Sequence, residues 1–106
     1  MAAAKKKDGK ESKSRLEIEG ELTIYVAAEL KEKIGALLGG DTAIEIDLAQ
    51  VGEIDSAGLQ LLLLAQRECA KQQKSIAFCN PSAAVLDCWR LCNVSELFGA
   101  YPAVVQ

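Results

Sequence analysis

The sequence predicts a small α/β domain in which a mixed, partly parallel sheet of four to five strands is flanked by helices. The chain has 106 residues, which fits one domain. Half of its residues are apolar and a quarter are charged, a composition typical of globular domains. Strand-like segments, in which every second residue is apolar, are followed along the chain by segments whose apolar residues have helical spacing. This order favours parallel strands joined by helices.

The first half is predicted to hold a strand pair, a helix and a single strand. Residues 15–23 alternate between apolar and charged side chains around a central glycine, which indicates a short hairpin or a bent strand pair. Apolar residues at helical spacing over 26–38 predict a helix that ends at the two glycines 39–40. Strict alternation over 43–48 predicts a half-buried strand, and a loop over 49–58 follows.

The second half is predicted to continue as helix, strand and helix. Residues 58–73 read as a strongly apolar helix, and 75–79 as a strand. The Asn-Pro-Ser segment 80–82 starts a third helix, because proline is tolerated near a first turn. Trp89 lies on the apolar face of that helix and is interpreted as a core residue or, alternatively, as an anchor at a partner interface. Residues 101–105 are a candidate last strand.

Charge divides the chain into two parts. Residues 1–14 hold five lysines and two acidic residues, while residues 15–106 carry a balance of −6 and the whole chain −3. We therefore expect 1–14 to be a disordered basic tail, either a solubilising leader or an arm for an anionic surface, and 15–106 to be the folded domain. The acidic domain and its few aromatic residues argue against nucleic acid as a partner.

Several chemistries are excluded by composition. The chain has no histidine, so Ser-His-Asp, Cys-His and His-Glu-x-x-His sites cannot form. We expect no metal, no cofactor and no catalysis; Asp47 and Asp55 are the paired carboxylates that an enzyme would offer, and they are interpreted as solvated or capping groups. No apolar run approaches the ~20 residues that span a bilayer, so we expect no membrane insertion.

The cysteine pattern suits a reducing compartment. The chain has four cysteines, none in a Cys-x-x-Cys pair, and no secretory signal precedes them. We expect reduced thiols in a cytoplasmic protein. Cys88 and Cys92 share one helix face, and small buried hydrophobic residues are a better interpretation for them than metal ligands.

The most informative stretch is 54–58, Ile-Asp-Ser-Ala-Gly. Asp55 and Ser56 are both good N-cap residues at the start of the apolar helix, and Gly58 permits a close approach. A helix cap is one interpretation. The functional alternative is a serine hydroxyl presented at a helix N-terminus, where a phosphate would face free N–H groups and the helix dipole.

With this turn in place, the sequence resembles the STAS domain family, named for sulfate transporters and anti-sigma-factor antagonists. The resemblance covers about residues 15–100 in four ordered blocks: GELTIYVAAELKEKI, IEIDLAQVGEIDSAGLQLLLLA, SIAFCNPSAAVLDCWRL and VSELFG. It implies a small mixed sheet with packed helices and a domain that binds proteins rather than catalysing a reaction. Length and the lack of histidine suit a single-domain bacterial member.

The resemblance also implies a switch. In antagonists of this family the residue at the position of Ser56 is phosphorylated by a partner kinase, the phosphate abolishes partner binding, and a phosphatase restores it. The chain has Thr23 and Ala57 where many phosphorylated members have aspartate and a hydroxyl residue. The implied partner surface consists of Thr23, Asp55, Ser56, Ala57, Gly58, Leu59 and Leu62.

Two functions follow as hypotheses. The first is a phosphorylation-controlled module of a bacterial partner-switching pathway, bound by an anti-sigma factor or a serine kinase. The alternative is a constitutive scaffold or accessory subunit that docks on a sensor, a chemotaxis component or an ABC-type lipid-transport ATPase, suggested by the excess of leucine over 59–64. The sequence leaves open both the partner's identity and the oligomeric state.

Overall fold

The computed structural model describes residues 13–40 and 42–98, and these form an alternating α/β domain. The elements in order are β1 (Lys13–Leu22), α1 (Ile24–Leu38), β2 (Ala43–Ile54), α2 (Ser56–Lys71), β3 (Ser75–Cys79), α3 (Ala83–Leu91) and a 3-10 helix, η2 (Ser95–Phe98). The predicted α/β class is confirmed. Within the described ranges the sheet has three strands, fewer than the four to five expected; residues 1–12 of the predicted tail and the predicted strand 101–105 lie outside these ranges.

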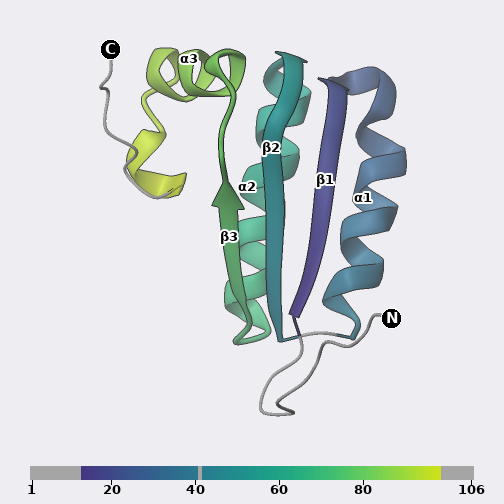
Figure 1. Ribbon diagram of the computed structural model, residues 1–106. Coiled ribbons are helices and arrows are strands. Elements are labelled where there is room, and N and C mark those ends of the chain that lie inside the picture. Colours follow the sequence, from purple (N-terminus) through teal and green to yellow (C-terminus); the bar gives the residue numbers. More distant parts are fainter. Residues whose placement is uncertain (1–12, 41, 99–106) are drawn as a thin grey trace.

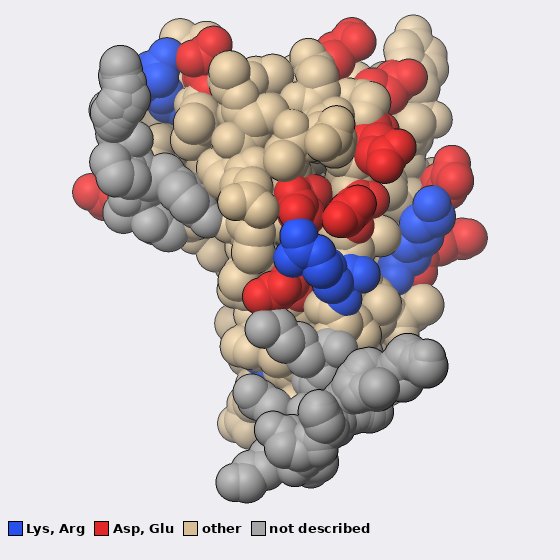
Figure 2. All heavy atoms as spheres, in the orientation of Figure 1, with Lys and Arg blue, Asp and Glu red and all other residues tan. Residues whose placement is uncertain are grey.

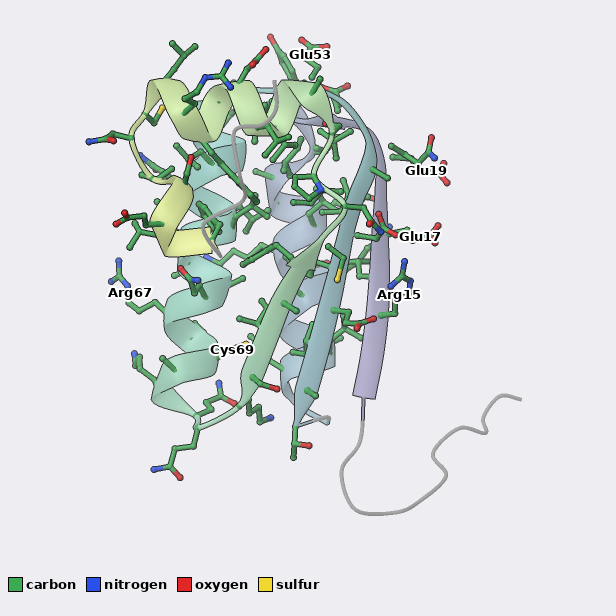
Figure 3. The ribbon with its side chains drawn as sticks, turned by 60° about the vertical axis from the view of Figure 1, so that its left-hand side comes forward. Arg15, Glu17, Glu19, Glu53, Arg67 and Cys69 are labelled. Carbon is green, nitrogen blue, oxygen red and sulfur yellow. The ribbon has the colours of Figure 1, made fainter. Side chains whose placement is uncertain are left out.

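The three strands are parallel and follow one another in the order β1-β2-β3. Helices α1 and α2 lie on the same face of this sheet (Figures 1 and 3). This is expected because both crossovers step in the same direction across the sheet, and crossovers share one hand. Helix α3 lies across the carboxyl end of the sheet (Figure 1).

One face of the sheet is apolar and packs against the helices, and the other face is charged. Strand side chains that pack against the helices form the core, among them Ile18, Ile44, Ile46, Leu48 and Phe78. On the opposite face acidic side chains gather around a central cation (Figure 2).

Arg15 lies on this charged face (Figure 3), where it pairs with Glu45 at 3.0 Å and with the largely buried Asp47. A hydrogen bond from the Ala49 N–H, aided by Asn80 and Arg15, lowers the pKa of Asp47. Asp47 is therefore a buried structural carboxylate of the sheet with partners inside the domain, and its interpretation as a solvated group is wrong.

The predicted hairpin over 15–23 is wrong. The segment is one strand, β1, which begins two residues before the predicted domain start at 15. Gly20 has φ +82°, and the register against β2 shifts on both sides of it. The glycine that looked like a turn is therefore a bulge, which bends the strand without reversing it.

The predicted loop over 49–58 is also wrong in most of its length. Strand β2 continues to Ile54, which pairs with Leu22 at the end of β1, so only Asp55 separates β2 from α2. Helix α1 ends at Gly39 as predicted. Pro81 precedes the N-cap Ser82 of α3 instead of lying within the first turn.

The carboxyl-terminal part is attached through aromatic side chains. Trp89 is fully buried; its ring stacks on Phe98 at a centroid distance of 4.5 Å and meets Phe78 edge-on at 6.5 Å. The interpretation of Trp89 as a core residue is confirmed, and the partner-anchor alternative is excluded by this burial.

The cysteine interpretation is only partly correct. All four described cysteines are free thiols, and Cys69 is buried between α2 and the sheet (Figure 3). Cys88 is half-buried, and burial raises the pKa of its thiol. Cys92 is exposed because it is the C-cap of α3, where the helix ends at the surface.

Candidate functional site

Two helix N-termini meet at the carboxyl edge of the sheet. Helix α1 starts directly after β1 and α2 directly after β2, and these strands are parallel neighbours. Carboxyl ends of parallel strands lie at the same edge, so the first turns of both helices come together there (Figure 1). This convergence is the candidate functional site.

Asp55 joins the two helices through one carboxylate. Its Oδ1 accepts from the Gly58 N–H of α2 at 3.0 Å, and its Oδ2 accepts from the Ile24 N–H of α1 at 3.1 Å. The Gly58 hydrogen bond, followed by that from Ile24, lowers the pKa of Asp55 below its ordinary value. The predicted cap is confirmed, and the structure shows that it serves two helices.

We expect Asp55→Asn to be less stable than the wild type at neutral pH, because its amide offers one acceptor oxygen to two N–H donors. A lowered folded pKa means that the stabilisation is present above the unfolded pKa and is lost as pH falls through the folded pKa. The difference between the two proteins should therefore be constant above about pH 5 and narrow below about pH 3.9. Urea unfolding at several pH values measures it; a gap that widens in acid contradicts this assignment.

Ser56 is the first residue of α2 and is exposed. Within the described part of the chain its hydroxyl makes no hydrogen bond, since Asp55 takes the capping position. Of the two capping candidates in the sequence, the structure selects Asp55 and leaves the serine oxygen accessible. The half-buried Ala57 follows it.

Thr23 has a structural role at this edge. It is 4% exposed and is the N-cap of α1, with its Oγ1 accepting from the Tyr25 N–H at 3.3 Å. The same hydroxyl donates to the Glu21 carboxylate. Thr23 lies beside the predicted site, but its side chain is buried against these groups, so the prediction that it contacts a partner protein is wrong.

Three further predicted partner residues lie in the interior. Leu59 and Leu62 are 7% and 0% exposed and belong to the hydrophobic core, because their stripe of α2 faces the sheet. The prediction that they contact a partner is therefore wrong. A Cβ on the buried Gly58 would lie 2.0 Å from the Leu22 carbonyl oxygen, so this glycine permits α2 to pack on the end of β1.

Two exposed apolar residues at the site were missed by the sequence analysis. Ile24 and Tyr25 are 62% and 88% exposed at the first turn of α1. The Ile24 amide is the one that binds Asp55, which places this residue next to the Ser56 turn. The available signal was their place directly after a threonine N-cap, where an inward-facing stripe has not yet begun.

Other chemistries find little support at this edge. Asp47 and Asp55 are separated by most of β2, eight residues or about 25 Å of strand, so they do not act as a pair. In residues 13–40 and 42–98, no three His, Cys, Asp or Glu side chains are grouped as metal ligands. No helix in the same ranges has the length and apolar character needed to cross a membrane.

The carboxyl edge of the parallel sheet presents an accessible serine beside exposed apolar residues. This arrangement is typical of a small α/β domain that binds other proteins. The family model described as "Mlab, STAS domain" matches residues 6–99. The chain therefore belongs to the STAS domain family, whose members are protein-interaction modules and not enzymes. No match was found among curated proteins.

Solved structures show the same fold. The anti-sigma factor antagonist SpoIIAA in its unphosphorylated form superposes with a TM-score of 0.68 at 20% identity, over 80% of this chain and 76% of that one. An anti-sigma factor antagonist from Mycobacterium paratuberculosis gives 0.69 at 24% identity, over 85% and 77%. A sulfate transporter family protein from Wolinella succinogenes gives 0.69 at 20% identity, over 82% and 71%.

Proposed function

We propose that the domain is a phosphorylation-controlled protein-binding module of a bacterial signalling pathway, with Ser56 as the phosphoacceptor. The observation that carries this proposal is the accessible Ser56 hydroxyl at the N-terminus of α2, adjoining the apolar residues Ile24 and Tyr25. These residues suit a docking surface for a protein such as an anti-sigma factor or a serine kinase. The SpoIIAA fold has also been solved in a phosphorylated form.

Phosphate on Ser56 would change this surface through charge. Transfer of a phosphoryl group from ATP to the serine oxygen adds almost two negative charges at pH 7. The Gly58 and Ile24 N–H groups already bind the Asp55 carboxylate, so the phosphate would lie beside a fixed negative charge. A partner that contacts this edge through acidic groups would then be repelled. A partner that contacts it through apolar groups would bind more weakly, because the phosphate would lose its water.

We expect Ser56→Asp to weaken binding of the natural partner by roughly tenfold to a hundredfold, because an added charge on a docking surface of this kind costs about 1.4–2.7 kcal/mol of binding free energy. Ser56→Ala should retain the partner. Ser75→Asp is the matched control, since it adds the same charge to an exposed serine at the opposite end of the sheet. Affinity purification from the native lysate identifies the partner, and titration with that purified partner gives the affinities.

Mass spectrometry after incubation with the partner kinase and ATP completes this test. Phosphate on Ser56 is the expected product, and phosphate only on other residues contradicts the proposal. Unchanged partner binding by Ser56→Asp would instead favour the constitutive docking subunit. The leucine excess that suggested this second function is largely accounted for by the core, which buries Leu59, Leu61 and Leu62.

A further inference from the structure

An apolar groove lies between α1 and α2 on their solvent side. It consists of two adjoining hollows of about 280 and 510 Å³ that share Lys31, Leu61 and Leu64. The larger hollow reaches Ala57, next to Ser56, and the smaller one extends to the other ends of both helices at Gly39 and Gln72. The groove therefore follows the helix pair from the candidate site to its far end.

The exposed Ile24 extends this groove toward the site. Ile24 lies one turn before Ala28 on the same side of α1, and Ala28 lines the larger hollow. Its side chain is 62% exposed, so it adds an uncovered apolar residue on that side of α1.

The charges at the groove differ from those on the rest of the domain. The described lysine and arginine side chains pair with acidic residues or a carbonyl oxygen inside the domain, except for Lys31 and Arg67; the paired ones are Arg15, Lys33, Lys71, Lys74 and Arg90. Lys31 and Arg67 both line the larger hollow, and Arg67 projects from α2 away from the sheet (Figure 3). The larger hollow has no acidic lining residue, and the acidic residue that lines the smaller one, Glu68, is paired with Lys71.

We infer that the groove between α1 and α2 binds an amphipathic helix of a partner protein, with apolar side chains on the half-buried Leu63 and Leu64 and carboxylates beside Lys31 and Arg67. Along α1 the groove runs from Ala27 to Gly39, about 18 Å or three helical turns, which matches a docked helix. Because the domain is acidic, a carboxylate-bearing helix is repelled elsewhere and attracted here. The inference rests on the proposed function only in that the domain binds a protein, and it requires no phosphate.

The test uses two synthetic amphipathic peptides with the same leucine spacing, one flanked by glutamates and one by lysines. Each is titrated into the isotope-labelled full chain while backbone amide signals are followed. We expect the acidic peptide to bind at least roughly tenfold more tightly, with the largest shifts at Ala28, Lys31, Leu61 and Leu64. Equal affinity for both peptides, or shifts centred elsewhere, would overturn the inference.

Charge-reversal variants make the test specific. Lys31→Glu with Arg67→Glu should reverse the preference toward the lysine-flanked peptide. Lys33→Glu with Arg90→Glu changes the net charge equally at residues outside both hollows, and should leave the preference intact. The same response in both double variants would indicate net charge alone and overturn the inference.

The same variants also test two other possible occupants of the groove. A dimer that Lys31→Glu with Arg67→Glu dissociates in sedimentation would assign the groove to a second copy. Tighter binding of palmitate than of the acidic peptide at these amides would assign it to an acyl chain. Either result overturns the partner helix.

The proposed helix-binding groove and the proposed phosphate switch can be contradicted independently of each other. Binding of the acidic peptide together with unchanged partner binding by Ser56→Asp leaves the groove and removes the switch. If the peptide does not bind but Ser56→Asp loses the partner, the phosphate switch is supported and the helix-binding groove is contradicted.

Discussion

Gly58→Ala is expected to destabilise the domain by roughly 3 kcal/mol or more, the upper range for overpacking a close contact. The added Cβ would lie 2.0 Å from the carbonyl oxygen of Leu22 and 2.8 Å from its carbonyl carbon. Backbone atoms at the end of a paired strand cannot yield as a flexible side chain can. The helix would have to move away from β1, and the Asp55 contacts with both helices would be disturbed.

Gly35→Ala provides the matched control for this substitution. Gly35 is also a helical glycine, but a Cβ at this position meets no atom within 4 Å. Alanine there should stabilise the domain by roughly 0.5–1 kcal/mol, because it lowers the entropy of the unfolded chain. Urea unfolding followed by circular dichroism compares the two variants. Equal stability of Gly58→Ala and Gly35→Ala would show that the close approach to Leu22 is not required.

The turn before α2 was predictable from the sequence in its local features and not in its long-range contact. The Asp-Ser-Ala-Gly stretch indicated a helix cap and a close approach, and both features are present at Asp55 and Gly58. Local residue chemistry was sufficient for these predictions because a cap contacts its own first turn. The second bond of Asp55 reaches Ile24, thirty-one residues earlier in the chain, and no local pattern specifies it.

The errors in the fold prediction have a shared physical cause. Polar residues and glycine between 49 and 54 resemble a loop, yet this segment is held in β2 by its long pairing with β1. Residues of α2 are apolar on more than one side, so periodicity alone did not show which stripe faces the sheet. Leu59 and Leu62 face it, whereas the half-buried Leu63 and Leu64 line the groove. Tertiary contacts decide both outcomes.

Trp89→Ala is expected to cost about 3–5 kcal/mol, the usual range for truncating a buried aromatic side chain. Trp89 is fully buried, and its ring stacks on Phe98 and contacts the edge of Phe78. These rings join α3 and η2 to β3, so the loss combines a large cavity with the detachment of the carboxyl-terminal elements. Because a domain of this kind has only about 5–15 kcal/mol of stability in total, the variant should unfold at much lower urea concentration.

Two companion variants separate burial from partner binding at this helix. Leu91→Ala removes an apolar side chain that is 84% exposed on the same helix, and its stability should stay within about 0.5 kcal/mol of the wild type. Trp89→Phe keeps an aromatic ring in the stack and should lose much less stability than Trp89→Ala. It should also bind the natural partner with unchanged affinity, since a fully buried side chain offers no surface to a partner. Reduced partner affinity in a fully folded Trp89→Phe would instead place α3 in the docking surface.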